Sequence, residues 1–417
     1  MNKWKPNRTE FYESAVSMGF YGREDSGLTG KKDNVRKFWE DVFMKLVTRP
    51  FIENRPYDDK KLRILDLGSG SGEGFELLTH IPPSNPSKGI TKDFVLKNSD
   101  IELYRGIDIS PAMISQGKAN YSDYGNVSFE YGNLEDGLPR EVTKDKPYDL
   151  YFSTYGSLSH LHPDSMERLM EQIFKHSNNG SVVLFDTHGK YSPAWPKYWG
   201  EEKILLPYTM AYLVPGEKRQ QEDIEWFDLC YWDPEDLKKL LNKAAQQAGV
   251  NINILYMLDR SIFISRHMDT GLLSTKPMQL RYQVSRLLDH GYRGEVAHLK
   301  VDLEHLDAYK GINPKVWNRL TDYSHKWNKI IYLLEALMNS EDKKVKDFIE
   351  NTNIELMGDD LKFITWLYRN ADRFPVVDFW ASLIGPQVAV ILRNIEMSYS
   401  EGVGCGHGLI CALEVIK

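Results

Sequence analysis

A strand, a glycine-rich turn and a helix follow one another between residues 62 and 80, and this unit constrains the fold most. Residues 62–67 are mostly apolar, include β-branched Ile64, and predict a short buried strand. The next five residues, Gly-Ser-Gly-Ser-Gly, let the backbone turn sharply and approach a ligand closely. Residues 73–80 are compatible with a helix, whose N-terminus would offer backbone N–H groups to a carboxylate or phosphate. The unit therefore predicts an α/β fold with a ligand-binding loop.

The spacing of the glycines separates two kinds of cofactor loop. The dinucleotide fingerprint requires glycine at its first, third and sixth positions. Counted from Gly68 the sixth position is Glu73, and counted from Gly70 it is Phe75. Both frames fail, which disfavours a nicotinamide-dependent dehydrogenase. Asp66 followed by glycine at 68, 70 and 72 instead resembles motif I of the class I S-adenosylmethionine-dependent methyltransferases.

The resemblance implies S-adenosylmethionine as the cofactor. In that family the loop cradles the methionine part of the cofactor, and the acidic residue lies at the end of the strand. The residues for which it implies cofactor contacts are Asp66, Gly68, Ser69, Gly70 and Gly72.

A second predicted strand, residues 102–107, leads into Asp108. An acidic residue at this place can accept hydrogen bonds from both ribose hydroxyls. Residues 81–100 are rich in Pro, Ser and Lys and predict a surface insertion. This insertion explains why Asp108 lies further from the glycine loop than the usual distance of about 20 residues.

A helix is predicted to begin after Asp108, with Ser110 as its cap and Pro111 at its first position. The same run resembles motif II of the family, whose apolar side chains flank the adenine. The resemblance therefore implies cofactor contacts from Ile109 and Met113.

The next two strands bring further residues to the same edge. The predicted strand 127–131 is followed by Asn133 and Leu134, where the family commonly has Gly-Asp-Ala. An amide can replace the carboxylate through its carbonyl oxygen, so the resemblance implies an adenine contact here. The fourth strand ends at Ser153, another implied cofactor residue. Residues 154–161 resemble motif IV of the small-molecule branch, whose loop lies beside the reacting methyl group.

Strands that alternate with helices predict a doubly wound, mostly parallel, Rossmann-like sheet. Ligands bind such sheets at the carboxyl ends of the strands, where the segments above all fall. Residues 251–258 and 261–266 are expected to form the terminal antiparallel pair that is typical of this fold. The resemblance covers residues 61–268, within a predicted cofactor-binding domain at 61–270.

Histidines near this rim are the candidates for proton transfer, to which imidazole is suited near neutral pH. A base is needed only if the nucleophile carries a proton. His188, directly after the predicted strand 181–186, is the first candidate, and His160 and Tyr155 are further candidate catalytic residues.

The N-terminal region, residues 1–60, is expected to form a helical cap. Residues 34–52 have apolar side chains at helical spacing. Such segments often cover the cofactor in the methyltransferase family. Tyr21 is therefore a further candidate for cofactor contact, and Tyr12 for cofactor or substrate contact.

Residues 187–232 interrupt the α/β pattern and are dense in Trp and Tyr. Two runs, 203–214 and 222–232, predict a hairpin over the rim of the site. Rings suit a planar or apolar substrate and can hold a cation over a ring face. The insertion favours a small aromatic or amine-bearing metabolite as the substrate.

Residues 271–417 carry no recognised motif and are expected to form a mainly helical C-terminal domain. Helices are predicted at 280–290, 315–338, 359–370 and 376–397, and a strand at 409–416. The domain leaves two alternatives open: a peptide or protein methyltransferase, and a non-catalytic cofactor-binding partner protein.

Composition narrows the class further. The 52 Lys and Arg residues against 59 Asp and Glu residues give a formal charge of −7, which disfavours a nucleic-acid partner. Three cysteines show no paired metal spacing, and no apolar run of about 18 residues is present. We therefore expect a cytoplasmic enzyme without a metal or a membrane partner. Homo-oligomerisation stays open.

Overall fold

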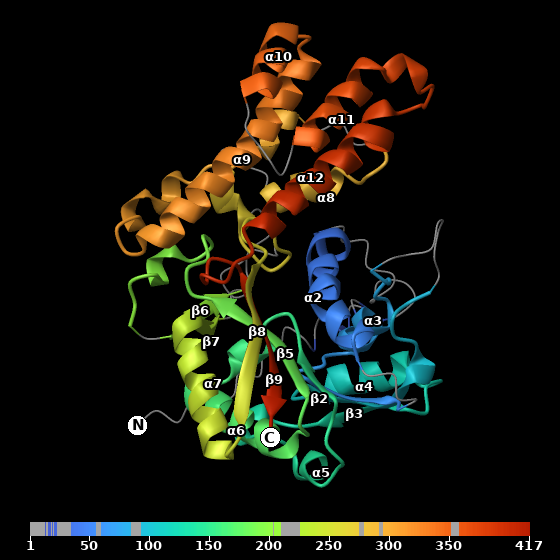
Figure 1. Ribbon diagram of the computed structural model, residues 1–417, viewed down its shortest axis with the longest axis vertical. Coiled ribbons are helices and arrows are strands. Elements are labelled where there is room, and N and C mark those ends of the chain that lie inside the picture. The colour runs from blue at the N-terminus through green and yellow to red at the C-terminus, as the bar shows by residue number, and fades with distance from the viewer. Residues whose placement is uncertain are drawn as a thin grey trace.

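The computed structural model describes most of the chain: residues 13, 16, 17, 19, 21, 22, 35–55, 60–84, 93–202, 204–209, 226–274, 279–291, 295–351 and 358–417. Within this part, a twisted sheet carries helices on both faces (Figure 1). A group of helices, α8 to α12, stands beyond one end of the sheet.

Five parallel strands form the centre of the sheet, in the order β3-β2-β1-β4-β5. In the middle of it, Leu65 pairs with Arg105 on one side and with Tyr151 on the other. This order confirms the predicted Rossmann-like sheet. The strands are β1 (Leu62–Leu67), β2 (Ile101–Asp108), β3 (Val127–Tyr131), β4 (Leu150–Ser153) and β5 (Val182–Gly189).

Two helical layers cover the sheet because successive side chains of a strand point to opposite faces. Ile64 packs in the core with α2 (Asp41–Glu53), α3 (Glu73–Thr79) and α4 (Pro111–Asn120). Its neighbour Leu65 packs in the opposite core. That core is formed with α5 (Arg140–Thr143), α6 (Pro163–His176) and α7 (Pro234–Ala248).

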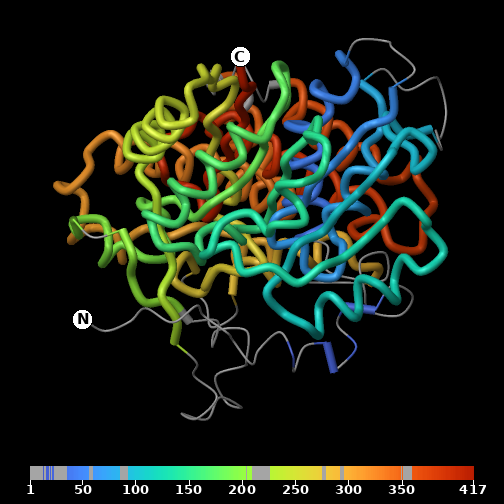
Figure 2. Tube along the Cα trace, turned by 90° about the horizontal axis from the view of Figure 1, so that it is seen from below, coloured from blue at the N-terminus to red at the C-terminus, as the bar shows by residue number. Residues whose placement is uncertain are grey.

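The last strand of the chain lies inside the sheet. β9 (Gly408–Ile416) runs antiparallel to both β5 and β8 (Asn251–Arg260), and it lies between them. Figure 2 shows the red C-terminal end among green and yellow segments of the chain. A terminal antiparallel pair is therefore present, as expected for this fold, but β9 supplies its second strand, and the predicted final strand is confirmed.

The predicted partner of β8, residues 261–266, is wrong. Ser261 has a φ of 59°, which ends the extended conformation after Arg260. The three following apolar residues, 262–264, are fully buried in the core of the helical region rather than in the sheet. Three adjacent apolar side chains suit a segment that is surrounded by helices better than a strand with alternating faces.

The helical region lies in sequence between two neighbouring strands, because the chain leaves the sheet after β8 and returns as β9. The predicted helices at 315–338 and 359–370 are confirmed. The one at 280–290 ends earlier, at residue 286, the one at 376–397 begins later, and α10 was not expected. The division of the chain at residue 270 stays a prediction. The elements are α8 (Leu280–Arg286), α9 (Pro314–Met338), α10 (Asp342–Asn351), α11 (Gly358–Arg369), the π-helical turn η13 (Trp380–Ile384) and α12 (Gly385–Ser398).

The N-terminal helix connects the two parts of the molecule. It begins with the π-helical turn η1 (Arg36–Glu40) and continues as α2, which confirms the predicted helix. Trp39 belongs to the core of the helical region, and its indole N–H donates to Glu396 of α12. One turn later, Phe43 belongs to the core on the sheet.

The aromatic insertion forms the predicted hairpin. β6 (Leu205–Thr209) pairs antiparallel with β7 (Trp226–Trp232), and the end of β7 pairs in parallel with the end of β5, at His188 and Gly189. The expected turn of this hairpin lies outside the described residues.

We predict that Leu413→Ala will lower the free energy of unfolding by about 2–5 kcal/mol, because Leu413 is fully buried in the middle of β9. The matched control is Ile416→Ala on the same strand, where the side chain is 43% exposed and the loss should stay below about 1 kcal/mol. Urea denaturation measures both. Equal, small losses would show that β9 is not a core strand.

Candidate active site

A cavity opens at the carboxyl ends of the parallel strands. The segments after β1, β2, β3 and β4 and the end of β5 all contribute to its wall, as ligand sites in open α/β sheets do. The candidate residues that line it are Tyr21, Asp66, Gly68, Ser69, Gly70, Asp108, Ile109, Met113, Asn133, Leu134, Tyr155, His160 and His188.

Two candidates do not line the cavity. Gly72 caps α3 with a φ of 96°, and a Cβ there would lie 2.4 Å from the ring of Tyr121. Ser153 is fully buried, and its hydroxyl donates to the backbone oxygen of Leu67 at 2.7 Å. Both residues support the loops of the site from behind. Tyr12 lies outside the described residues.

The glycine loop is held against its neighbours by backbone contacts. The N–H groups of Gly68 and Ser69 both donate to the carbonyl oxygen of Ile107, at 2.8 and 3.0 Å. Gly68 has a φ of 72°, which L-residues rarely adopt, and a Cβ there would lie 2.5 Å from the Cβ of Ser157. The loop that follows β4 therefore packs directly against the loop that follows β1.

Asp108 connects the loops after β1 and β2. Its Oδ2 accepts the Gly70 N–H and its Oδ1 accepts the Ser110 N–H, both at 2.8 Å. Burial raises the pKa of this carboxyl, and the two backbone N–H groups oppose that rise. Each oxygen has a second lone pair, so the carboxylate retains the capacity to accept from a diol. Ser110 also accepts from Met113 N, which confirms the predicted cap.

Asp66 lies at the end of β1, where α3 packs closely upon it. A Cβ at Gly74 would lie 2.2 Å from Asp66 Oδ2, so glycine is required there. The hydroxyl of Tyr104 donates to the same oxygen. Burial raises the pKa of Asp66 to about 7, against the opposing effect of this hydrogen bond.

These residues fit S-adenosylmethionine. Ser69 Oγ is buried and has no hydrogen-bond partner among the described residues, so it is available to a polar ligand group. The start of α3 offers its N-terminus to a carboxylate. Asp108 matches a ribose, and Ile109, Met113 and Leu134 supply apolar surface for a base.

The amide of Asn133 is held within its own turn. Its Oδ1 accepts from Glu135 N at 3.2 Å and its Nδ2 donates to Asp136 at 3.0 Å. The side chain lines the cavity, and the implied contact with an adenine amino group stays a prediction.

Aromatic side chains line the cavity beyond the loop that follows β4. Phe227 of β7 stacks on His160, with ring centroids 5.5 Å apart and planes 21° apart. Tyr208 of β6 donates its hydroxyl to the backbone oxygen of His267 at 2.6 Å. The hairpin thus supplies two rings to the cavity, whereas other rings of the insertion, such as Trp199 and Trp232, are buried in the interior.

His188 is a neutral imidazole with a defined tautomer. Its Nδ1 lies 3.1 Å from the backbone oxygen of His407. Because a carbonyl oxygen only accepts, Nδ1 carries the proton and Nε2 keeps a lone pair. Burial lowers the pKa of His188 to about 4, and burial also lowers that of His160 to about 4. Both rings are therefore uncharged at neutral pH.

The hydroxyl of Tyr155 is engaged away from the histidines. It donates to Asp41 of α2, and the guanidinium of Arg36 lies 4.3 Å from the centre of its ring. Burial raises its pKa well above the ordinary value of 10. The residue lines the cavity, and its proposed catalytic role is untested.

Several lining residues were not among the candidates. Arg36 and Glu73 contact each other at 2.8 Å, and both lie on the wall of the cavity. Arg36 lies at helical spacing from Trp39, on the apolar face of a predicted helix. A charged residue on such a face was the signal that could have identified it. The remaining lining residues in this class are Glu13, Gly74, Ser110, Gly132, Glu135, Thr154, Ser157, Leu161, Tyr208, Phe227, Leu229 and His267.

Metal ligands and membrane-spanning helices are both absent from the described residues. These residues contain no group of three His, Cys, Asp or Glu side chains arranged to hold a metal ion. None of their helices has the length and apolar character needed to cross a bilayer.

We predict that Gly68→Ala will weaken S-adenosylmethionine binding about tenfold or more, because its Cβ would displace the loop that carries Ser157. Gly249→Ala is the matched control: Gly249 has a φ of 71°, and a Cβ at this position would have nothing within 4 Å. Both variants carry the same backbone strain. Calorimetric titration should show weakened binding for Gly68→Ala alone, and equal affinities would exclude the loop as the binding site.

The chain resembles known proteins in part of its length. Residues 58–244 match the family model described as a methyltransferase domain. No curated protein matches the chain. Solved structures that resemble it include an S-adenosylmethionine-dependent methyltransferase from Clostridium acetobutylicum, at 15% identity over 54% of this chain and 87% of that one, with a TM-score of 0.35.

Two further structures are similar at the same low level. The complex of the Haloferax volcanii Trm112 methyltransferase activator with a putative methyltransferase shares 16% identity over 67% of this chain and 92% of that one, with a TM-score of 0.38. The DhpI–SAH complex shares 16% identity over 59% and 88%, with a TM-score of 0.35. The family match, the strand order and the geometry of the glycine loop agree on the nature of this domain. Residues 58–244 are a methyltransferase domain of the class I S-adenosylmethionine-dependent superfamily, and S-adenosylmethionine is the cofactor of this enzyme.

Proposed function

We propose that this methyltransferase acts on a small metabolite that is aromatic or carries an amine, and that it methylates nitrogen, oxygen or carbon. The observation that supports this most is the ring-lined part of the cavity. Phe227 stacked on His160, with Tyr208 beside them, offers flat apolar surface of the kind that receives a planar group.

The bound cofactor supplies an electrophilic methyl group on a sulfonium. The task of the protein is then to hold the acceptor in line with that methyl group and to exclude water. His188 Nε2 is the group that receives the proton of a hydroxyl or ammonium acceptor. The backbone oxygen of His407, which accepts from Nδ1, keeps this ring in the orientation that leaves Nε2 free.

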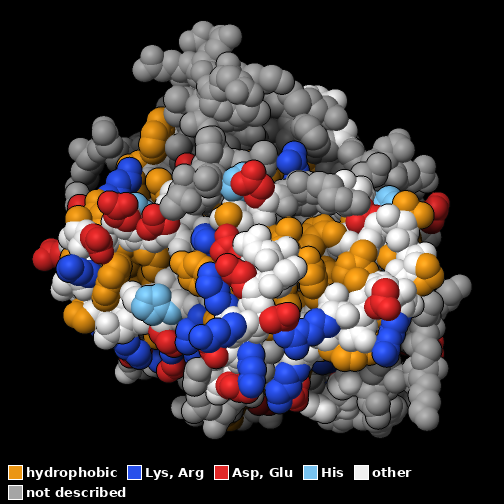
Figure 3. Space-filling model, turned by 90° about the horizontal axis from the view of Figure 1, so that it is seen from above, with side chains coloured by type: hydrophobic (Ala, Val, Ile, Leu, Met, Phe, Trp, Pro, Cys, Tyr) orange, Lys and Arg blue, Asp and Glu red, His pale blue; other side chains and the backbone are white. Residues whose placement is uncertain are grey.

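Two alternative functions are less well supported. A peptide or protein substrate would dock on the helical region, and a non-catalytic partner protein would bind the cofactor without turnover. Nucleic acid is disfavoured by the charge of −7, and Figure 3 shows acidic and basic side chains interspersed on the face it presents. A cytoplasmic location and the absence of a membrane partner stay predictions, and homo-oligomerisation stays open.

An acceptor screen with methyl-labelled cofactor tests the proposal. The panel comprises phenols, catechols and aromatic amines, together with peptides and transfer RNA. Labelled small molecules would support it. Labelled peptides alone would favour the first alternative, and cofactor binding without any turnover would favour the second.

We predict that His188→Gln will lower kcat about 10²- to 10⁴-fold for a protonated acceptor, with an unchanged affinity for S-adenosylmethionine, because glutamine cannot take the proton. His305→Gln is the matched control: that ring also contacts a backbone oxygen, that of Pro193 at 3.0 Å, burial also lowers its pKa, and it does not line the cavity. Steady-state kinetics separates the two variants. A similar kcat for His188→Gln and wild type would remove His188 from proton transfer.

The pH dependence of kcat gives a second prediction. His188 accepts a proton only when neutral, and its pKa is lowered from the usual 6.5 to about 4. Activity should therefore stay level as the pH falls from about 7 to about 5.5, and it should decline as the pH approaches about 4. The measurement uses an acceptor that does not titrate in this pH range, so that the change in kcat reports the protonation of the enzyme. Half-maximal kcat near pH 6.5 would indicate an exposed base instead.

A further inference from the structure

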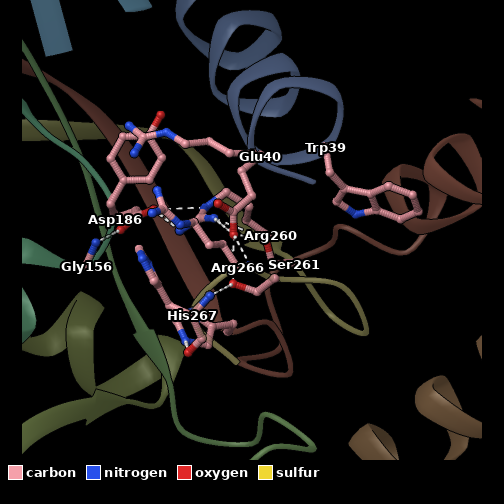
Figure 4. Close-up of polar contacts among 12 residues, drawn as sticks. Trp39, Glu40, Gly156, Asp186, Arg260, Ser261, Arg266 and His267 are labelled. Carbon is pink, nitrogen blue, oxygen red and sulfur yellow. Dashed lines mark hydrogen bonds and ion pairs between the residues drawn. The ribbon is translucent and has the colours of Figure 1, made fainter. Parts of the chain in front are cut away.

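A buried arginine connects the N-terminal helix to the loop beside the reaction site. Arg260 is the last residue of β8, and its side chain is 3% exposed. Its Nε and Nη2 donate to Asp186 Oδ2 at 2.9 and 2.6 Å, and its Nη1 lies 3.3 Å from Glu40 Oε1 (Figure 4). One guanidinium thus joins β8, β5 and the helical turn η1.

The Asp186 side of this cluster holds the turn after β4. Asp186 Oδ1 accepts the N–H of Gly156, so the carboxylate bridges Arg260 and the turn. Tyr155 and Gly156 have φ values of 58° and 78°. A left-handed tyrosine is strained and persists only where its surroundings hold it. This turn lies on the cavity wall through Tyr155, and it leads into Ser157, which packs against the glycine loop.

The Glu40 side of the cluster holds the N-terminal helix. Glu40 Oε1 also accepts from Ser265 Oγ at 2.7 Å and from Arg266 N at 3.2 Å. The same helix contacts the turn directly: Arg36 lies over the ring of Tyr155, and Asp41 accepts its hydroxyl. The helix and the turn therefore share two sets of contacts, one of them through Arg260.

The connection between the N-terminal helix and the turn depends on the buried charge of Arg260. A buried charge is tolerated when its partners are in place, and loss of one partner leaves the others uncompensated. If the N-terminal helix moves away, Arg260 loses Glu40. If the turn moves, Asp186 loses Gly156. Each displacement alters the contacts of the other element.

We propose that Arg260 is a positioning residue for methyl transfer. It holds the Tyr155–Gly156 turn and the N-terminal helix in one arrangement around the cofactor. The turn keeps its position only while the helix is in place, and the helix only while the turn is in place. This role rests on the cofactor site and is independent of which acceptor the enzyme uses.

The test compares Arg260→Met with Arg63→Met. Arg63 is a matched control because it is also a buried, ion-paired arginine, 2.7 Å from Glu102. It lies at the start of β1, at the opposite edge of the sheet from the cavity. Calorimetry measures S-adenosylmethionine binding, and hydrogen exchange measures protection of the backbone N–H groups of residues 153–157. Thermal unfolding records the loss of stability in both variants.

We expect Arg260→Met to bind S-adenosylmethionine about tenfold more weakly and to exchange faster at residues 153–157. Arg63→Met should lose stability without either change. The single effects of Arg260→Met and Glu40→Gln on affinity should add to more than the effect of the double variant, because both act on one contact. Arg260→Lys keeps the positive charge but loses the planar guanidinium that donates two hydrogen bonds to Asp186. Its affinity for S-adenosylmethionine should therefore be intermediate.

Wild-type affinity and wild-type exchange in folded Arg260→Met would overturn the proposal. If Arg260→Met does not fold, the same measurements are made on Arg260→Lys. Wild-type affinity and wild-type exchange in Arg260→Lys would likewise overturn the proposal. Full additivity of Arg260→Met and Glu40→Gln would also overturn it. Failure of wild-type protein to bind S-adenosylmethionine is a different result, because it would overturn the cofactor site itself.

Discussion

The pairing of β8 with β9 joins the helical region to the sheet. The two strands pair from Asn251 with Ile416 to Arg260 with Gly408, with one irregularity between Ile254 and Tyr256. Because β8 and β9 are antiparallel neighbours, the end of β8 lies beside the start of β9, and the helical region begins and ends at the same side of the sheet. A Cβ at Gly408 would lie 2.9 Å from Arg260 Nε, so the start of β9 packs on the guanidinium that holds Asp186.

The electrostatics of the cavity divides it into two parts. The part that fits the cofactor holds Asp66, Asp108 and backbone N–H groups, which suit a ligand with polar and charged groups. The part beyond it holds rings and the neutral histidines 160 and 188. Burial lowers the pKa of the two histidines and so keeps their rings uncharged, whereas at Asp108 the backbone N–H groups of Gly70 and Ser110 oppose the rise in pKa that burial causes.

The parallel half of the fold was predictable from local patterns. The strand before the glycine loop, the cap at Ser110 and the hairpin of the aromatic insertion all depend on short-range sequence, and the structure confirms them. The place of β9 was not predictable, because its partner β8 is separated from it by the whole helical region. The same holds for Arg36, Glu40 and Arg260, whose partners come from distant segments. Periodicity indicates that such residues face inward, and it does not identify the charge that each one meets.

The glycine loop and Asp108 hold S-adenosylmethionine and not a dinucleotide. Calorimetric titration of wild-type protein and of Asp108→Ala with S-adenosylmethionine and with NAD tests this assignment of the cofactor. We predict binding of S-adenosylmethionine to wild type, strongly reduced binding to Asp108→Ala, and no binding of NAD to either. Folded wild-type protein that binds NAD, or that binds S-adenosylmethionine equally well without the Asp108 carboxylate, would contradict this account of the site.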